Sequence, residues 1–284
     1  MAIERVAVVG AGTMGSGIAQ VLALAGFPLK LIDVASGQVE RALRAIDVDL
    51  SKAVANRRIS ETQRVEALGR IVGSVEITDA SDADLVIEAI VEDFGAKSSL
   101  LRELDRVCRP EAIFASNTSS ISITRLAGAT SRSDRVIGMH FFNPVPAMRL
   151  VEVIRGMATS DNTMTLVLQA VQALGKTAVA VQDYPGFVSN RLLMPMINEA
   201  AYALMEGVAT RDAIDTVMKL GMNHPMGPLE LADLIGLDVC LYIMRVLQEG
   251  FGDDKYRPCP LLVNMVAAGR LGRKVGRGFY DYQD

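Results

Sequence analysis

A histidine and a glutamate twelve residues apart are the side chains of this sequence best suited to proton transfer. His140 is one of only two histidines and follows the apolar run 136–139, while Glu152 lies in the alternating stretch 150–154. An imidazole exchanges protons near neutral pH, and a neighbouring carboxylate orients the ring and raises its basicity. The two residues therefore indicate a general acid–base pair. A histidine at a strand end that bonds to the backbone is the alternative that these residues leave open.

A glycine-rich loop near the start of the sequence indicates a dinucleotide site. The loop 10–15 follows the strand-like run 5–9 and opens a helical pattern over 14–24. In such a loop the first glycine permits a tight turn, the second lets a pyrophosphate approach the backbone, and the third lets the helix pack on the strand. The helix N-terminus then offers N–H groups to the phosphates. The predicted cofactor contacts here are Gly10, Gly12, Thr13, Met14 and Gly15.

An acidic residue after the second apolar run indicates which nucleotide binds. The run 29–32 reads as a strand and is followed by Asp33. A carboxylate in that place accepts hydrogen bonds from the ribose hydroxyls of an adenosine and repels the 2′-phosphate of NADP. The segment 34–37 holds no arginine that would bind such a phosphate. The sequence therefore predicts NAD as the cofactor, and the alternative is a glycine-rich turn that binds no nucleotide.

Seven motifs follow one another along the chain in an order known from one family. They are GAGTMGSGIAQ at 10–20, EAIVED at 88–93, SNTSS at 116–120, HFFNPVPAMRLVEV at 140–153, PGFVSNRLL at 185–193, GMNHPMGPLELAD at 221–233 and GRKVGRGFYDY at 272–282. With these motifs the chain resembles the L-3-hydroxyacyl-CoA dehydrogenases, and most closely the short-chain bacterial branch, the 3-hydroxybutyryl-CoA dehydrogenases. The resemblance implies reversible oxidation of a short-chain L-3-hydroxyacyl-CoA to the 3-ketoacyl-CoA with NAD.

The same resemblance implies roles for individual side chains. His140 would take the proton of the C3 hydroxyl, Glu152 would stabilise the imidazolium, and Ser119 with Asn190 would hold the C3 oxygen. For the serine-rich stretch, an ordinary cap of a helix over 122–127 is the alternative. The residues implied around the nicotinamide half of the cofactor are Glu92, Lys97, Ser119, Asn143 and Lys274.

The connection between Asp33 and a further strand expected near Val75 is longer than a simple crossover needs. Roughly forty residues lie there, and they read as a helical hairpin over 38–55 and 60–68. In the resembled family this hairpin contacts the adenosine end of coenzyme A, which implies phosphate contacts for Lys52 and Arg57. A solvated helix face explains these basic residues equally well.

Strand-like and helical runs alternate up to residue 184, which is typical of a Rossmann-type, doubly wound, mainly parallel α/β sheet. The strand-like runs are 5–9, 29–33, 85–89, 112–116, 135–140, 149–154 and 177–181, of which the later ones suit antiparallel additions. Helical periodicity then covers 192–204, 213–220, 229–248 and 260–268. We expect an NAD-binding domain over 1–184 and an all-helical domain over 185–284 that binds substrate. Its extensive apolar stripes indicate a homodimer, and the alternative is that the first domain covers them.

Composition excludes several other classes of protein. The 284 residues suit about two domains, and a net charge of −4 without a basic cluster argues against a nucleic-acid partner. No secretory leader and no apolar run near the roughly 20 residues that span a bilayer are visible, so we expect no membrane partner. Three scattered cysteines suit reduced thiols in the cytoplasm. Distant histidines and unpaired cysteines offer no metal-binding set.

Other interpretations of the function stay open from the sequence. A related sugar-acid dehydrogenase of the L-gulonate type shares the glycine loop and the HFxNP core, and a 3-hydroxyadipyl-CoA dehydrogenase of aromatic-acid degradation would share the acyl-CoA chemistry. The β-hydroxyacid dehydrogenases share a GxGxMG opening but use a lysine base. A nucleotide-sensing or structural protein on the same fold is also conceivable, but it leaves the acid–base pair unexplained.

Overall fold

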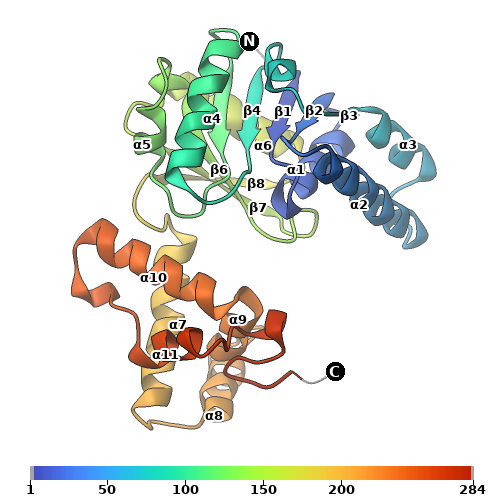
Figure 1. Cartoon of the computed structure of the whole chain (residues 1–284). Coiled ribbons are helices and arrows are strands. Elements are labelled where there is room, and N and C mark those ends of the chain that lie inside the picture. The colour runs from blue at the N-terminus through green and yellow to red at the C-terminus, as the bar shows by residue number, and fades with distance from the viewer. Residues whose placement is uncertain (1–2, 283–284) are drawn as a thin grey trace. The chain divides into compact units, whose positions relative to one another are not determined.

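The computed structural model describes residues 3–282, and the chain divides into two compact units, Met1–Asp183 and Tyr184–Asp284. Within the described residues the first unit holds an eight-stranded sheet with helices on both faces (Figure 1). The strands are β1 (Val6–Val9), β2 (Leu29–Ile32), β3 (Ile71–Ser74), β4 (Leu85–Glu88), β5 (Ile113–Ser116), β6 (Val136–Phe141), β7 (Leu150–Arg155) and β8 (Thr177–Gln182). The α-helices of this unit are α1 (Thr13–Leu24), α2 (Ser36–Ala55), α3 (Glu61–Gly69), α4 (Phe94–Val107), α5 (Ile123–Ala127) and α6 (Asp161–Ala173).

The strand order of the sheet is β3-β2-β1-β4-β5-β6-β7-β8. Strands β1 to β6 are parallel, β7 is antiparallel to β6, and β8 is parallel to β7. The predicted Rossmann-type sheet with antiparallel additions is therefore confirmed. Because the chain leaves β1 first toward β2 and later returns to its other side with β4, the carboxyl ends of β1 and β4 flank the switch point at which such sheets bind ligands.

The two faces of the sheet serve different purposes. In Figure 1, α4 lies in front of the sheet and α6 behind it. Alternate residues of β6 enter the apolar core that α1, α2 and α6 cover, namely Ile137, Met139 and Phe141. Since side chains of a strand alternate between faces, Gly138 and His140 point to the other face, where a Cβ on Gly138 would lie 3.0 Å from Ile123 of α5.

The strand register extends this second face toward the switch point. Glu88 of β4 pairs with Ser116 of β5, which pairs with Gly138 of β6. Residues paired in register point to the same face of a sheet, so Glu88 and Ser116 share the face of His140. The polar residues at the carboxyl ends of three neighbouring strands therefore lie on one side of the sheet.

Helices α2 and α3 form the predicted hairpin between β2 and β3 and project from the β3 edge of the sheet (Figure 1). Helix α3 begins with a capping box, in which the Ser60 hydroxyl accepts from the Gln63 backbone and the Gln63 side chain accepts from the Ser60 backbone. On α2 the residues that contact the core recur at helical spacing, and they are Val39, Ala42, Ile46 and Leu50. The fold class that the sequence predicts, including this insertion, is confirmed.

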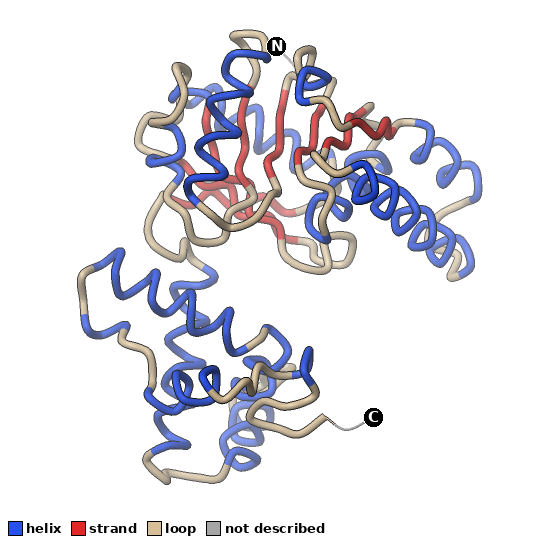
Figure 2. Tube along the Cα trace, viewed as in Figure 1, coloured by secondary structure: helices blue, strands red, loops and turns tan. Residues whose placement is uncertain are grey.

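The described part of the second unit consists of helices joined by loops (Figure 2). Its helices are α7 (Ser189–Met205), α8 (Arg211–Thr216), a π-helical turn at Val217–Gly221, α9 (Pro228–Ile235), α10 (Leu237–Phe251) and α11 (Pro260–Ala267). The sequence predicts one helix over 229–248, which is wrong because the chain breaks at Gly236. This residue adopts a φ of +107°, a conformation open mainly to glycine, and it separates α9 from α10.

Two further findings bear on the class of protein. None of the helices described is long and apolar enough to cross a membrane. The cysteines at 108, 240 and 259 are buried and form no disulfide.

Candidate active site

His140 and Glu152 face each other across the antiparallel pair β6 and β7. The register places them directly opposite one another, and His140 Nδ1 lies 2.8 Å from Glu152 Oε2. Both side chains are buried. An ionised Glu152 accepts a hydrogen bond from Nδ1–H, which leaves Nε2 as the ring nitrogen that can take or return a proton. The structure therefore brings together the two residues that the sequence pairs, in an arrangement that suits general acid–base chemistry.

Asn117 supports the strand end that carries His140. The pairing of β5 with β6 ends at Ser116 and Gly138. Beyond that point the Asn117 Oδ1 accepts a hydrogen bond from the Phe141 backbone N–H at 2.9 Å. The side chain thus continues the hydrogen bonding of the sheet past His140. Sequence reasoning placed this amide after a predicted strand, within the motif at 116–120, but gave it no role.

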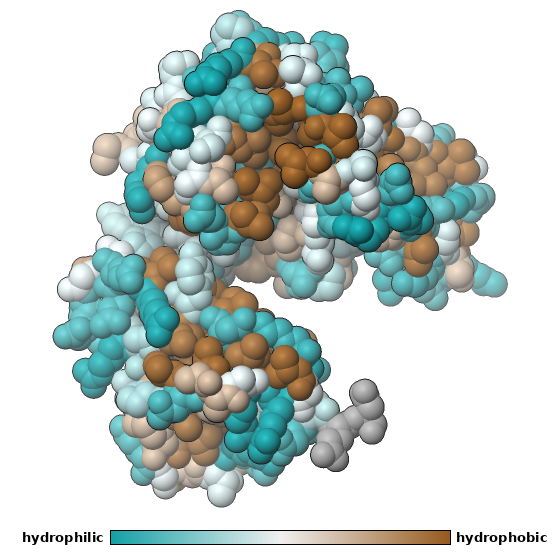
Figure 3. Space-filling view, viewed as in Figure 1, coloured by the Kyte–Doolittle hydropathy of each residue, from teal (hydrophilic) through white to brown (hydrophobic). Residues whose placement is uncertain are grey.

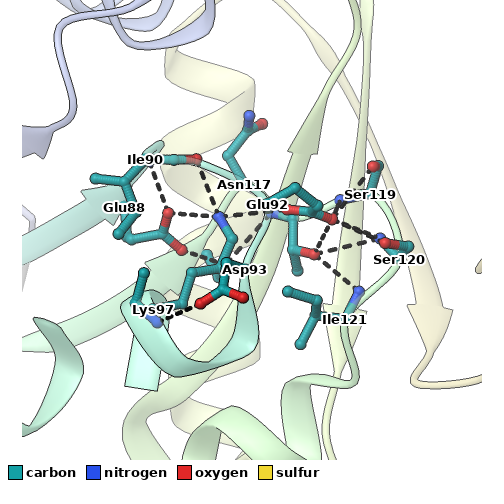
Figure 4. Close-up of polar contacts among 12 residues, drawn as sticks. Glu88, Ile90, Glu92, Asp93, Lys97, Asn117, Ser119, Ser120 and Ile121 are labelled. Carbon is teal, nitrogen blue, oxygen red and sulfur yellow. Dashed lines mark hydrogen bonds and ion pairs between the residues drawn. The ribbon is translucent and has the colours of Figure 1, made fainter. Parts of the chain in front are cut away.

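Glu92 organises the hydroxyl-rich turn that follows β5 (Figure 4). Its Oε1 accepts from Thr118 Oγ1 at 2.6 Å, from Ser120 Oγ at 2.9 Å and from the Ser119 backbone at 3.0 Å. Ser119 Oγ lies 3.3 Å from the same oxygen. One carboxylate oxygen therefore fixes the backbone and the hydroxyl groups of the turn that presents Ser119.

The serine-rich turn is not the cap of the next helix. The N-cap of α5 is Ser122, whose Oγ accepts from the Arg125 backbone. Asp183 also binds this helix start, because its carboxylate accepts from Ser122 Oγ at 2.8 Å and from the Thr124 backbone at 2.7 Å. The capping role that was the alternative for residues 116–120 therefore belongs to other side chains.

Lys97 lies buried between two carboxylates next to this turn (Figure 4). Its Nζ is 2.6 Å from Glu88 Oε1 and 3.4 Å from Glu92 Oε2, and the side chains of Lys97 and Glu88 are each 1% exposed. Glu88 also accepts from Ser116 Oγ at 2.6 Å and from the Ile90 backbone at 2.8 Å. We call Glu88, Lys97 and Glu92 the lysine cluster. Sequence reasoning named Lys97 and Glu92 but missed Glu88 and Ser116, which are polar residues at the ends of apolar strands.

The lysine cluster keeps Glu92 ionised. Burial alone would raise the pKa of Glu92. The charge of Lys97 and the hydrogen bonds from Thr118, Ser120 and Ser119 outweigh burial, so the pKa lies below its ordinary value. The turn therefore keeps its acceptor at neutral pH.

The glycine loop has the shape that a dinucleotide requires. Gly10 adopts a φ of +102°, and a Cβ there would lie 2.5 Å from the Ala89 carbonyl oxygen. A Cβ on Gly15 would lie 1.7 Å from the Gly10 oxygen, so the start of α1 packs directly on the loop. Nothing described lies within 4 Å of the corresponding position on Gly12. Open space in front of a helix N-terminus allows a phosphate to reach the backbone N–H groups, so these residues fit a pyrophosphate.

A pocket of about 750 Å³ adjoins the glycine loop. The carboxylate of Asp33 stands at its wall, where it accepts from the Ala11 backbone at 2.8 Å and from the Ala35 backbone at 3.1 Å. The apolar lining includes Val34, Val75, Ile77, Val91 and Leu100. Figure 3 shows hydrophobic side chains gathered between α4 and α2 on the visible face of this unit. A carboxylate beside an apolar wall suits the ribose and adenine of NAD.

The remaining predicted contacts of the cofactor and of the C3 oxygen lie on different elements. Asn143 lies two residues after the end of β6, in the loop that leads to β7. Asn190 lies in the first turn of α7 in the second unit. Lys274, also in the second unit, contacts Asp238 with Nζ–O distances of 2.6 and 2.7 Å. Burial would raise the pKa of Asp238, but the hydrogen bond and the charge of Lys274 hold it below its ordinary value.

The predicted coenzyme A contacts belong to the helical hairpin, at the β2–β3 end of the sheet and several strands away from His140. Lys52 is exposed and forms an ion pair with Asp49 at 3.2 Å. Arg57 lies just after α2 with a φ of +57°. Neither observation distinguishes a phosphate site from a solvated helix face, so the coenzyme A contacts of both residues stay predictions.

Comparison with known families and proteins identifies the family of this chain. Residues 5–184 match the family model "3-hydroxyacyl-CoA dehydrogenase, NAD binding domain", and residues 186–282 match "3-hydroxyacyl-CoA dehydrogenase, C-terminal domain". A Bacillus subtilis protein named "Probable 3-hydroxybutyryl-CoA dehydrogenase" is 56% identical over 284 residues, which are 100% of this chain and 99% of that protein. A Bradyrhizobium diazoefficiens protein named "3-hydroxybutyryl-CoA dehydrogenase" is 55% identical, over 99% of this chain and 96% of that protein.

A solved structure has nearly the same fold. The crystal structure of (S)-3-hydroxybutyryl-CoA dehydrogenase from Ralstonia eutropha superposes with a TM-score of 0.98 at 49% identity, and the match covers 100% of both chains. The two family models, these relatives and this structure all carry the name of one group of dehydrogenases. The chain therefore belongs to the 3-hydroxyacyl-CoA dehydrogenase family, and its cofactor is NAD.

Proposed function

We propose that this chain catalyses the reversible oxidation of a short-chain L-3-hydroxyacyl-CoA to the 3-ketoacyl-CoA, with 3-hydroxybutyryl-CoA and acetoacetyl-CoA as the preferred pair. The observation that carries the proposal is the His140–Glu152 contact of 2.8 Å at the carboxyl end of β6. The names of the relatives from Bacillus subtilis and Bradyrhizobium diazoefficiens support the four-carbon substrate.

In the oxidation, His140 removes the proton of the C3 hydroxyl group. Its Nε2 takes this proton, because Nδ1 is committed to Glu152. The carboxylate of Glu152 then stabilises the imidazolium and holds the ring in its orientation. The bound nicotinamide supplies the acceptor for the hydride that leaves C3. In the reverse direction the imidazolium of His140 returns its proton to the C3 oxygen.

Ser119 binds the C3 oxygen during this proton transfer. Glu92 accepts hydrogen bonds from the Ser119 backbone and, at 3.3 Å, from its hydroxyl group. The turn is therefore already ordered, and substrate binding costs it little conformational entropy. Asn190 is a second donor to the same oxygen. This assignment rests on the motif PGFVSNRLL at 185–193.

The first unit binds most of the dinucleotide. The glycine loop, with Thr13 and Met14 at the start of α1, binds the pyrophosphate, and Asp33 binds the adenosine ribose. Around the nicotinamide half the proposed residues are Glu92, Lys97, Ser119, Asn143 and Lys274. Lys52 and Arg57 of the helical hairpin bind the phosphates at the coenzyme A end of the acyl-CoA substrate.

The domain roles complete the proposal. Residues 1–184 bind NAD, and residues 185–284 bind substrate and form a homodimer in the cytoplasm. Exposed apolar side chains of the second unit support self-association, among them Leu192, Val208, Leu220 and Met222, which are 61–83% exposed. Sedimentation of the wild type beside Leu220→Lys tests the dimer: the variant is expected to dissociate, and a monomeric wild type contradicts the proposal.

The direct test of the function is NADH oxidation with a panel of substrates. Acetoacetyl-CoA is expected to give the highest kcat/KM among 3-ketoacyl-CoA esters of rising chain length. Reduction of a 3-ketoadipyl-CoA with higher kcat/KM would select the aromatic-acid pathway instead. Activity on L-gulonate with NAD, together with none on acetoacetyl-CoA, would overturn the acyl-CoA assignment.

A further inference from the structure

A buried lysine outside the proposed catalytic set binds the connection between β6 and β7. Lys176 precedes β8 and is 9% exposed. Its Nζ donates to the Val145 carbonyl oxygen at 2.7 Å and to the Met148 carbonyl oxygen at 2.5 Å. Burial lowers the pKa of the ammonium group. An apolar side chain would fill this position without that desolvation cost, so the two hydrogen bonds are what the lysine adds.

The segment that Lys176 binds joins the two strands of the acid–base pair. Residues 142–149 leave β6 just after His140 and enter β7 just before Glu152, and they include Asn143. We call this segment the 142–149 loop. It begins one residue after the Phe141 backbone that Asn117 holds, so its start is fixed.

Val145 of the 142–149 loop packs against α1, the helix that follows the glycine loop. Val145 is 2% exposed, and a Cβ on Gly17 of α1 would lie 2.9 Å from the Val145 Cβ. The loop therefore contacts both α1 and Lys176. The Thr177 backbone N–H, which donates to the Arg149 carbonyl oxygen at 2.7 Å, fixes its end.

We propose that Lys176 is a positioning residue, whose two hydrogen bonds to the 142–149 loop hold Asn143 in place for the cofactor. The inference rests on the proposed function, which assigns Asn143 to the nicotinamide half of NAD. Lys176 itself touches neither cofactor nor substrate in this account. It acts through the Val145 and Met148 carbonyls and the backbone between them and Asn143.

Loss of the ammonium group leaves two carbonyl oxygens near the core without their donor, and the 142–149 loop then shifts to find others. The binding of the nicotinamide half weakens as a result. Asp33 and the pocket beside it hold the adenosine half on the β1–β2 side of the sheet, and these groups do not contact Lys176. A positioning role therefore predicts weaker binding of NADH with unchanged binding of ADP. A general loss of structure weakens both.

The test compares Lys176→Met with Lys176→Arg, which keeps buried N–H donors. The matched control is Val181→Ala, a truncation of a buried side chain on β8 that makes no hydrogen bond to the loop. For each variant the dissociation constants of NADH and ADP, the kcat and KM with acetoacetyl-CoA, and the melting temperature are measured. If Lys176→Met does not fold, Lys176→Gln replaces it, because its amide retains one donor group.

Lys176→Met is expected to raise the dissociation constant of NADH about tenfold and to leave that of ADP within about twofold. Lys176→Arg is expected to restore most of the NADH affinity. Val181→Ala is expected to lower the melting temperature without changing the NADH affinity. Unchanged NADH affinity in Lys176→Met, or an equal loss for ADP, would overturn the inference. Asn143→Ala separates the role of Asn143 from that of Lys176. Unchanged NADH binding in Asn143→Ala contradicts the proposed role of Asn143. Weaker NADH binding in Asn143→Ala, together with unchanged NADH binding in Lys176→Met, contradicts only the role of Lys176.

Discussion

Two polar clusters lie on one face of the same sheet, and their composition differs. The His140–Glu152 pair joins one imidazole to one carboxylate across β6 and β7. The lysine cluster places Lys97 between Glu88 and Glu92, with several hydroxyl and backbone donors around the carboxylates. An imidazole can accept and return a proton, whereas the Glu92 carboxylate beside Lys97 accepts hydrogen bonds from the turn that follows β5. The first cluster is thus suited to exchanging a proton and the second to holding a turn in place.

This difference predicts different consequences of mutation. Changes in the His140–Glu152 pair are expected to lower turnover with little effect on stability. Changes in the lysine cluster are expected to lower the free energy of unfolding, because a buried charge loses its partner. Each of the following predictions either separates the two clusters or shows that they act alike.

The largest effect is expected for the base. His140→Gln is predicted to lower kcat by about 10²- to 10⁴-fold, because the amide cannot accept the proton of the C3 hydroxyl. The dissociation constant of NADH and the melting temperature are expected to stay near the wild-type values. His224→Gln, which removes the other histidine, serves as the matched control and is expected to keep its activity. Near-normal turnover of His140→Gln would remove the pair from the mechanism.

The next largest effect is expected for the lysine cluster. Lys97→Met leaves Glu88 as a buried carboxylate without its cation and is predicted to lower the free energy of unfolding by about 3–5 kcal/mol. The double variant Glu88→Gln with Lys97→Met removes that charge and is expected to regain a large part of the loss. Denaturation with urea measures both. If Lys97→Met is as stable as the wild type, the cluster does not hold the turn in the way described.

A smaller effect is expected where a neutral hydrogen bond supports the reactive strand. Asn117→Ala removes the acceptor of the Phe141 backbone N–H and is predicted to lower kcat by about tenfold or less. Asn117→Asp keeps an acceptor oxygen in the same place and is expected to retain more of the turnover. Equal kinetics for the alanine and aspartate variants would show that this bond does not position His140.

The smallest effect is expected in the pH dependence of stability. The pKa of folded Glu92 lies below its ordinary value of 4.5, so this group stabilises the fold fully above about pH 4.5. That contribution is lost as the pH falls through the folded pKa. Urea unfolding at pH 3 to 7 is expected to show a stability difference between wild type and Glu92→Gln that is greatest above pH 4.5 and shrinks below it. A difference that grows on acidification would mean that the sign of the pKa shift is wrong.

Much of the fold could be predicted from local patterns. The apolar runs mark the strands because strands of a parallel sheet are buried on both faces, and β1, β4 and β5 are buried along their whole length. The glycine loop is recognisable because its spacing answers a local steric need, which the contact between Gly15 and the Gly10 oxygen illustrates. The helix over 229–248 was wrong because one glycine in a periodic run does not reveal whether its φ is positive.

The support of the site could not be predicted in the same way. Ser116 bonds to Glu88, and Asn117 bonds to Phe141, on neighbouring strands 28 and 24 residues away in the sequence. Only the contact between Glu88 and Lys97 is local, with nine residues of separation. Lys176 binds carbonyl groups 28 and 31 residues away, and a lone lysine before a strand carries no local sign of that role. Only the register of the strands brings such residues together.

The measurement that tests the central claim most directly is a double-mutant cycle on kcat with His140→Gln, Glu152→Gln and the combined variant. Acetoacetyl-CoA reduction by NADH under saturating conditions gives the four rates. If Glu152 acts through the imidazole, the combined variant is predicted to be no slower than His140→Gln alone, because residues that act as a unit are strongly non-additive. If the two losses instead multiply in the combined variant, Glu152 and His140 act independently and the proposed acid–base pair is wrong.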